Sequence, residues 1–165
     1  MARIERKLAA IMLADIAGYS ALMEANESRT FERARALRED LINPTVARYG
    51  GRVVKTTGDG FLAEFSTGSA ALLCGIDIQR ANHARETRAP EKERIHLRIG
   101  INLGDIIVDG DDVSGDGVNV AARLEPLAPK DGICVSGAVR DQVREDLDVV
   151  FEDLGDQAVK NIKRP

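Results

Sequence analysis

The sequence lacks any long apolar run. No apolar stretch approaches the roughly 20 residues that a helix needs to cross a bilayer. The start, Met1–Lys7, also lacks the apolar stretch of a secretory signal, and there is neither a low-complexity tract nor an internal repeat. We therefore expect no membrane partner within this segment and a cytoplasmic location, while membrane attachment of a longer protein stays open.

Cysteine is scarce, and the sequence has no excess of positive charge. Of the two cysteines, Cys74 falls in a helical pattern and Cys134 in an apolar strand, which favours two buried, reduced thiols over a disulfide. The 23 Lys and Arg residues are outnumbered by 27 Asp and Glu residues, for a formal net charge of −4. This balance argues against a nucleic acid as the main partner.

The composition is that of one compact domain. With 44% hydrophobic and 30% charged residues, a chain of 165 residues buries a normal core, so we predict a single domain over 1–165. Periodicity and turn signals predict the following order: a strand over 8–15, helices over 20–49, a hairpin over 52–65, a helix over 68–87 capped by Ser66 or Thr67, paired strands over 94–109, and then helix, strand, helix, strand. This order fits an α/β (α+β) fold, with a ferredoxin-like βαββαβ core, extra strands and an antiparallel sheet flanked by helices.

An aspartate closes the first strand. Seven apolar residues, Leu8 to Ala14, run into Asp15, as expected for a strand that is buried on both faces and delivers a charge at its end. Asp15 alone could be a strand-end residue or a helix cap. An unpaired carboxylate after so apolar a strand is harder to dismiss, because burying an unpaired charge is costly. Gly18 follows closely and lets the backbone approach a ligand.

A second aspartate lies at a predicted hairpin tip, in Lys55-Thr56-Thr57-Gly58-Asp59-Gly60. Asp-Gly is common in hairpins, so Asp59 by itself is more often a turn residue than a ligand. If the two strands are sheet neighbours, Asp15 and Asp59 lie side by side and repel unless a cation lies between them. Hard divalent ions that carry nucleotide phosphates are usually held by one or two carboxylates plus the phosphates.

Asn119 and Arg123 lie four residues apart on a helix predicted from about 117 to 127, and so share a face. The arginine fork suits phosphate oxygens and the amide suits a ribose. For an isolated pair, a solvated polar face would be the better interpretation. The turn-rich loop upstream, Asp111 to Gly117, leads into the helix N-terminus and favours a ligand site.

Together these segments resemble the class III adenylyl and guanylyl cyclase catalytic domains, most closely those of soluble bacterial, rhizobial-like adenylyl cyclases. The resemblance covers essentially the whole chain. It implies that Asp15 and Asp59 bind two divalent metal ions, magnesium or manganese, and that Asn119 and Arg123 act on the transition state. The nucleotide would be bound by four further residues, namely Lys55, Asp112, Ile16 and Gly18.

The same resemblance implies the reaction and the assembly. The ribose 3′-hydroxyl of ATP attacks the α-phosphorus, giving cyclic AMP and pyrophosphate. Lys55 and Asp112 complement the N1 acceptor and N6 donor of adenine, whereas the family's guanylyl cyclases typically have Glu and a small residue at these places. The site would form between two protomers of a head-to-tail homodimer. One protomer would supply Asp15 and Asp59, and its partner Lys55, Asp112, Asn119 and Arg123.

Alternatives remain at this point. Lys55 could be a surface lysine and Asp112 one solvated acid among several. A catalytically silent nucleotide-binding domain of the same fold, a guanylyl cyclase and a diguanylate cyclase are the competing functions, although the Gly-Gly-acid-Glu-Phe hairpin of the last is absent. Departures from the commonest family pattern include Asn102, where a histidine is frequent. The ending at Gln157–Pro165, where the family usually adds a strand, indicates a piece of a longer protein.

Overall fold

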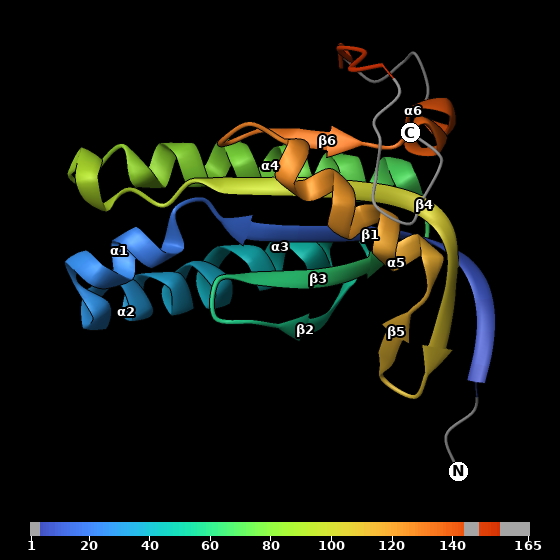
Figure 1. The fold of residues 1–165 in the computed structure, drawn as a ribbon, viewed down its shortest axis with the longest axis horizontal. Coiled ribbons are helices and arrows are strands. Elements are labelled where there is room, and N and C mark those ends of the chain that lie inside the picture. The colour runs from blue at the N-terminus through green and yellow to red at the C-terminus, as the bar shows by residue number, and fades with distance from the viewer. Residues whose placement is uncertain (1–3, 144–148, 156–165) are drawn as a thin grey trace.

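A single curled sheet organises the domain in the computed structural model, which describes residues 4–143 and 149–155 (Figure 1). Its strands in the described chain are β1 (Ile4–Ile16), β2 (Arg52–Thr56), β3 (Gly60–Phe65), β4 (Leu97–Asp109), β5 (Asp112–Ser114) and β6 (Ile133–Val135). The spatial order is β2-β3-β1-β4-β5, with β6 also paired to β4. All pairs are antiparallel except β4 with β6.

The helices lie on both faces of this sheet. They are α1 (Tyr19–Ala25), α2 (Glu27–Leu37), η1 (Arg38–Ile42), α3 (Asn43–Arg48), α4 (Gly68–Glu86), η2 (Glu91–Glu93), α5 (Asp116–Leu124), η3 (Glu125–Leu127) and α6 (Gly137–Gln142). The order β1, helices, β2, β3, α4, β4 is the βαββαβ core that the sequence predicted, with β5 and β6 as the extra strands.

The central strand β1 is buried on both faces. Alternate residues Ala10, Met12 and Ala14 belong to the core formed with α2, α3 and α4. The intervening residues Ala9 and Ile11 belong to a second core, which α5 covers through Ala121. Because side chains alternate along a strand, Asp15 lies on the α5 face. The α5 face is therefore where the candidate site is built.

Several predicted elements are confirmed. The helix predicted over 68–87 is α4, and Thr67 caps it by accepting a hydrogen bond from the Ala70 N–H at 3.0 Å. The helices expected over 20–49 are α1 to α3, and Gly50 ends them with a φ of 74°. The predicted hairpin is β2 and β3. Both cysteines are free and buried, and burial raises the pKa of the Cys74 thiol to about 12.

One expectation about strands was wrong. Residues 94–109 do not form paired strands, because β4 is one strand that pairs with β1 over its full length, Ile4 with Asp109 through Ile16 with Leu97. The turn comes later, at Gly110 with a φ of 62°, and Figure 1 shows the second half of β4 curving round to β5. The last strand expected after α6 is not seen in 149–155, and residues 144–148 and 156–165 lie outside the described part, so this expectation stays a prediction. Among the described helices, none is long and apolar enough to cross a bilayer.

Candidate active site

Strand pairing places Asp15 next to the tip of the β2–β3 hairpin. Asp15 is in register with Gly60, and the Ile16 N–H donates to the Asp59 carbonyl oxygen at 2.7 Å. A Cβ atom on Gly60 would lie 2.1 Å from the Ala14 carbonyl oxygen, so only glycine lets the strands approach here. The two aspartates that the sequence singled out are thus brought to one end of the sheet.

The hairpin also orients the Asp59 side chain. The Thr57 hydroxyl donates to the Asp59 carboxylate at 3.2 Å, and the Thr57 N–H donates to the Gly60 carbonyl at 2.9 Å. Asp15, Lys55, Thr57 and Asp59 line one pocket of about 310 Å³. The hairpin therefore contributes both a carboxylate and a cation to this pocket.

Ile16 and Gly18 flank Asp15 differently. The Ile16 side chain is buried in the core under the helices, so what it offers near the site is its backbone, which is already bonded to Asp59. Gly18 precedes α1 with a φ of 66°, is exposed and has open space where a Cβ would stand. Its left-handed conformation, rather than crowding, is what favours glycine there.

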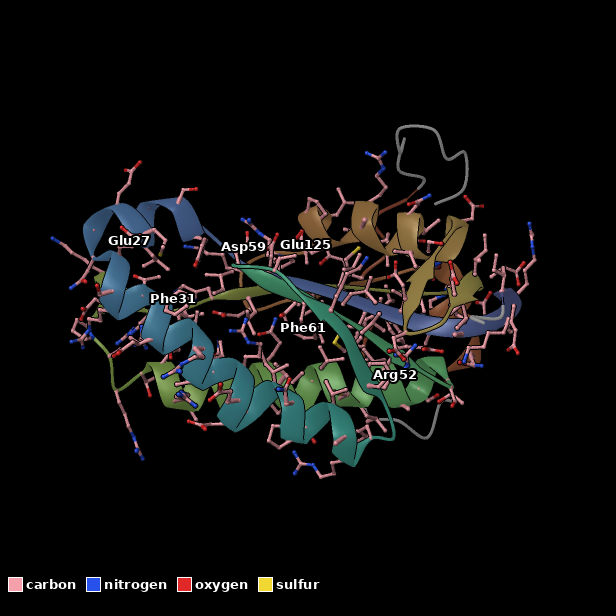
Figure 2. The ribbon with its side chains drawn as sticks, turned by 90° about the horizontal axis from the view of Figure 1, so that it is seen from below. Glu27, Phe31, Arg52, Asp59, Phe61 and Glu125 are labelled. Carbon is pink, nitrogen blue, oxygen red and sulfur yellow. The ribbon has the colours of Figure 1, made fainter. Side chains whose placement is uncertain are left out.

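Glu125, which the sequence reasoning missed, reaches the same pocket from η3. Figure 2 shows it beside Asp59, and it also lines the pocket. Burial, a hydrogen bond with Asp15 and the negative charges of Asp15 and Asp59 raise the pKa of Glu125 to about 8, against the opposing charge of Arg98. The signal for it was an acid inside the apolar run Leu124–Ala128, which is costly unless the acid has a partner.

Arg98 was missed as well. It is the β4 residue opposite Asp15 in the β1–β4 register, so both side chains lie on the α5 face. Its Nε atom is buried and has no hydrogen-bond partner in the described chain. Its guanidinium therefore lies close to the carboxyl groups of Asp15 and Glu125.

Lys55 and Asp112 meet although β2 and β5 are opposite edges of the sheet. The Lys55 Nζ and Asp112 Oδ1 atoms are 3.2 Å apart. A bulge between Val53 and Lys55 shifts the register so that Lys55 pairs with Leu62, a residue of the α5-side core. The hydrogen bond from Lys55, then the Val113 N–H, lowers the pKa of the exposed Asp112 carboxyl.

Asn119 and Arg123 lie apart from this pocket. Both are exposed on α5, and neither side chain has a hydrogen-bond or ion-pair partner within residues 4–143 and 149–155. The helix itself is held tightly, because the Asn102 amide donates to the Gly117 carbonyl at 3.0 Å. The structure thus brings together the aspartates and Lys55, and Lys55 with Asp112, but leaves Asn119 and Arg123 facing outward.

The pocket fits cations that are completed by a ligand. In the part of the chain that the structure describes, no set of three or more His, Cys, Asp and Glu side chains is arranged to hold a metal ion alone. Two carboxylates, Asp15 and Asp59, leave most of a metal's oxygen positions to phosphates and water, as magnesium prefers in nucleotide sites.

Comparison with known proteins identifies the family. The family model described as "Adenylate and Guanylate cyclase catalytic domain" matches residues 3–164. A Rhizobium meliloti protein named "Putative adenylate cyclase 3" is 45% identical over 98% of this chain, and the Streptomyces coelicolor "Adenylate cyclase" is 33% identical over 85% of it. The chain spans only 28% and 35% of these two relatives.

A solved structure is similar to this chain in sequence and fold over nearly the whole length of both. The adenylate/guanylate cyclase/hydrolase of Silicibacter pomeroyi is 52% identical, with a TM-score of 0.92 over 99% of this chain and 95% of that one. Sequence, fold and site geometry lead to one conclusion: the chain belongs to the adenylate and guanylate cyclase catalytic domain family.

Proposed function

We propose that this domain is an adenylyl cyclase, a phosphorus–oxygen lyase that converts ATP to cyclic AMP and pyrophosphate at a homodimer interface. The observation that carries the proposal is the pairing of β1 with β3, which sets Asp15 beside the hairpin tip of Asp59 in one pocket. Relatives named as adenylate cyclases support the same reaction.

Asp15 and Asp59 would hold two divalent metal ions, magnesium or manganese. When bound, such ions lower the pKa of a hydroxyl group and neutralise charge on transferring phosphates. The backbone bond from Ile16 to the Asp59 carbonyl and the Thr57 hydroxyl bond to its carboxylate fix Asp59 before any ligand arrives. Such prior fixing matters because positioning is most of what phosphoryl transfer requires of a protein.

In the reaction, the ribose 3′-oxygen bonds to the α-phosphorus while the bond to the pyrophosphate oxygen breaks, and the hydroxyl proton leaves to water. Arg123 would stabilise the negative charge that develops on the α-phosphoryl group, and Asn119 would orient the ribose. Both side chains are exposed and lack partners in the described residues, as groups reserved for a ligand would be.

Adenine selection is assigned to Lys55 and Asp112. Their 3.2 Å contact places a cation and an anion together, matching the N1 acceptor and the N6 donor of adenine. Guanine presents a donor at N1 and an acceptor at O6, the reverse order, so ATP is favoured over GTP. Leaving such polar partners unpaired costs on the order of a few kcal/mol.

The two halves of the site are joined by a second copy of the chain. Asn119 and Arg123 do not line the pocket of Asp15 and Asp59 within one protomer. In a head-to-tail homodimer, the α5 face of one protomer would supply Lys55, Asp112, Asn119 and Arg123 to the aspartates of its partner, forming two equivalent sites.

The deciding test is an assay of cyclic nucleotide formation. The purified chain is supplied with ATP or GTP and magnesium or manganese at several protein concentrations, beside Asp59→Ala as a control. Cyclic AMP from ATP, rising more than linearly with protein and absent in the variant, is the expected result. A folded dimer that binds ATP without turnover would instead indicate a silent nucleotide-binding domain, and preferential cyclic GMP formation a guanylyl cyclase.

A further inference from the structure

Close packing of η3 on β4 positions Glu125 near Asp15 and Asp59. A Cβ atom at Gly100 would lie 2.5 Å from the Glu125 backbone nitrogen and 2.8 Å from its Cα. Contacts that short are possible only over glycine, so the first residue of η3 rests directly on the strand. Gly100 lies two residues beyond Arg98 on the same face of β4, which brings Glu125 level with the end of β1.

The side chain of Glu125 is almost fully enclosed, at 7% exposure. One of its oxygens, Oε1, is buried without a hydrogen-bond partner in the described chain, and Glu125 lines the same pocket as Asp15. Asp59 lines the same pocket and acts on Glu125 by its charge. A buried acid beside two others is unfavourable for stability alone, so a role at the site is the better explanation.

Glu125 lies beside a candidate metal ligand. Among the described residues, no three acids are arranged to hold a metal ion by themselves, and Glu125 lines the same pocket as Asp15. Carboxylates that bind metals are generally held by hydrogen-bonding neighbours, and losing such a neighbour typically weakens metal affinity about 10- to 100-fold. Glu125 occupies that neighbouring position relative to Asp15.

We propose that Glu125 is a positioning residue: its carboxyl group, fixed by the contact of η3 with Gly100, holds the Asp15 side chain in the orientation that binds metal. The inference rests on the proposed function, since it assumes that Asp15 and Asp59 bind divalent ions. It gives the acid in the Leu124–Ala128 run a task separate from those of Asn119 and Arg123.

The test measures Mn²⁺ binding directly, in the presence of a non-reactive ATP analogue, by the electron paramagnetic resonance signal of free Mn²⁺. Glu125→Ala should weaken binding about 10- to 100-fold. Glu125→Gln should bind close to wild type, because its amide donates to Asp15 from the same place. Glu125→Asp keeps the carboxyl group but withdraws it by one methylene, and should bind weakly. Asp141→Asn, an exposed acid on α6, serves as the matched control and should change nothing.

The outcomes separate the possibilities. Wild-type affinity in both Glu125→Ala and Glu125→Asp would overturn the positioning role, and so would a Gln variant as weak as the Ala variant, since that would indicate a direct anionic ligand. The proposed function and this inference fail together if wild type does not bind Mn²⁺, or if Asp59→Ala leaves the binding unchanged. Thermal unfolding of every variant checks the fold, and the Gln and Asp variants carry the test if Glu125→Ala is unfolded.

Discussion

At the scale of single residues, Arg123 is distinguished by what surrounds it. Its guanidinium is exposed and has no partner in the described residues, so it contributes little to folding. Arg123→Ala should therefore lower kcat about 100- to 1,000-fold, the loss typical of one group that stabilises developing charge. Its stability should stay within about 0.5 kcal/mol of wild type, as for most surface changes.

Steady-state kinetics and urea unfolding measure the two effects. Arg140→Ala, which removes an exposed arginine from α6, is the control and should leave kcat unchanged. Equal kcat values in the Arg123 and Arg140 variants would contradict a role for Arg123 in the reaction.

Mutation can separate two roles of the Lys55–Asp112 pair, reading the base and stabilising the fold. Lys55→Glu places two acids together and removes the cation, so the ratio of kcat/KM for ATP over GTP should fall at least about tenfold, given the cost of unpaired polar groups. The double variant Lys55→Glu/Asp112→Lys restores an ion pair with reversed polarity. It should recover any lost stability without recovering the preference for ATP.

Kinetics with both nucleotides, together with thermal unfolding, distinguish these effects. Recovery of the ATP preference in the double variant would show that the pair acts through structure rather than by reading the base. The exposed pair itself contributes little to stability, because surface ion pairs are weak.

At the scale of elements, the fit of α5 and η3 on β4 depends on a glycine. Gly100→Ala would force a Cβ to within 2.8 Å of the Ala121 carbonyl and 2.5 Å of the Glu125 nitrogen. We expect a loss of about 1–3 kcal/mol in the free energy of unfolding, as for overpacked cores. Gly137→Ala should instead be neutral or stabilise by up to about 1 kcal/mol, because the added Cβ would meet no atom within 4 Å beyond its chain neighbours and its own helix backbone.

Urea unfolding of both variants makes this comparison. Similar stabilities for Gly100→Ala and Gly137→Ala would contradict the close contact of η3 with the sheet. Because Gly100 fixes Glu125, we also expect Gly100→Ala to weaken Mn²⁺ binding.

At the scale of the whole molecule, the proposed sharing of each site between two protomers predicts complementation. Asp59→Ala and Arg123→Ala disable opposite halves of the site, so each should be inactive alone. When the two variants are combined in equal amounts, half of the dimers would contain one chain of each. Each of these dimers has one intact site of two, so the expected activity is about a quarter of wild type. A mixture of Asp15→Ala and Asp59→Ala, which disable the same half, should stay inactive.

Cyclic AMP formation before and after mixing tests this assembly. Activity that returns in neither mixture would argue against sites shared between protomers, provided the variants still dimerise by ultracentrifugation. Activity that returns in both mixtures would show that the two aspartates do not belong to one half.

The sequence by itself determined much of this protein. The apolar run ending at Asp15, the Asp-Gly hairpin and the capped helix after Thr67 are local signals, because burial on both faces, turn geometry and capping depend on neighbouring residues. The same locality explains why the βαββαβ order could be predicted. It also explains why the Asn119–Arg123 spacing was visible before any contact was known.

Tertiary structure alone decided the rest. Glu125 and Arg98 meet Asp15 only through the β1–β4 register and the contact of η3 with Gly100, neither of which is encoded in a local pattern. The bulge in β2 turned Lys55 toward Asp112 across the curl of the sheet. β4 stayed one long strand because β1 offers it a partner along its whole length. Pairing partners and curvature depend on residues far apart in the chain, which is why only the folded structure could settle them.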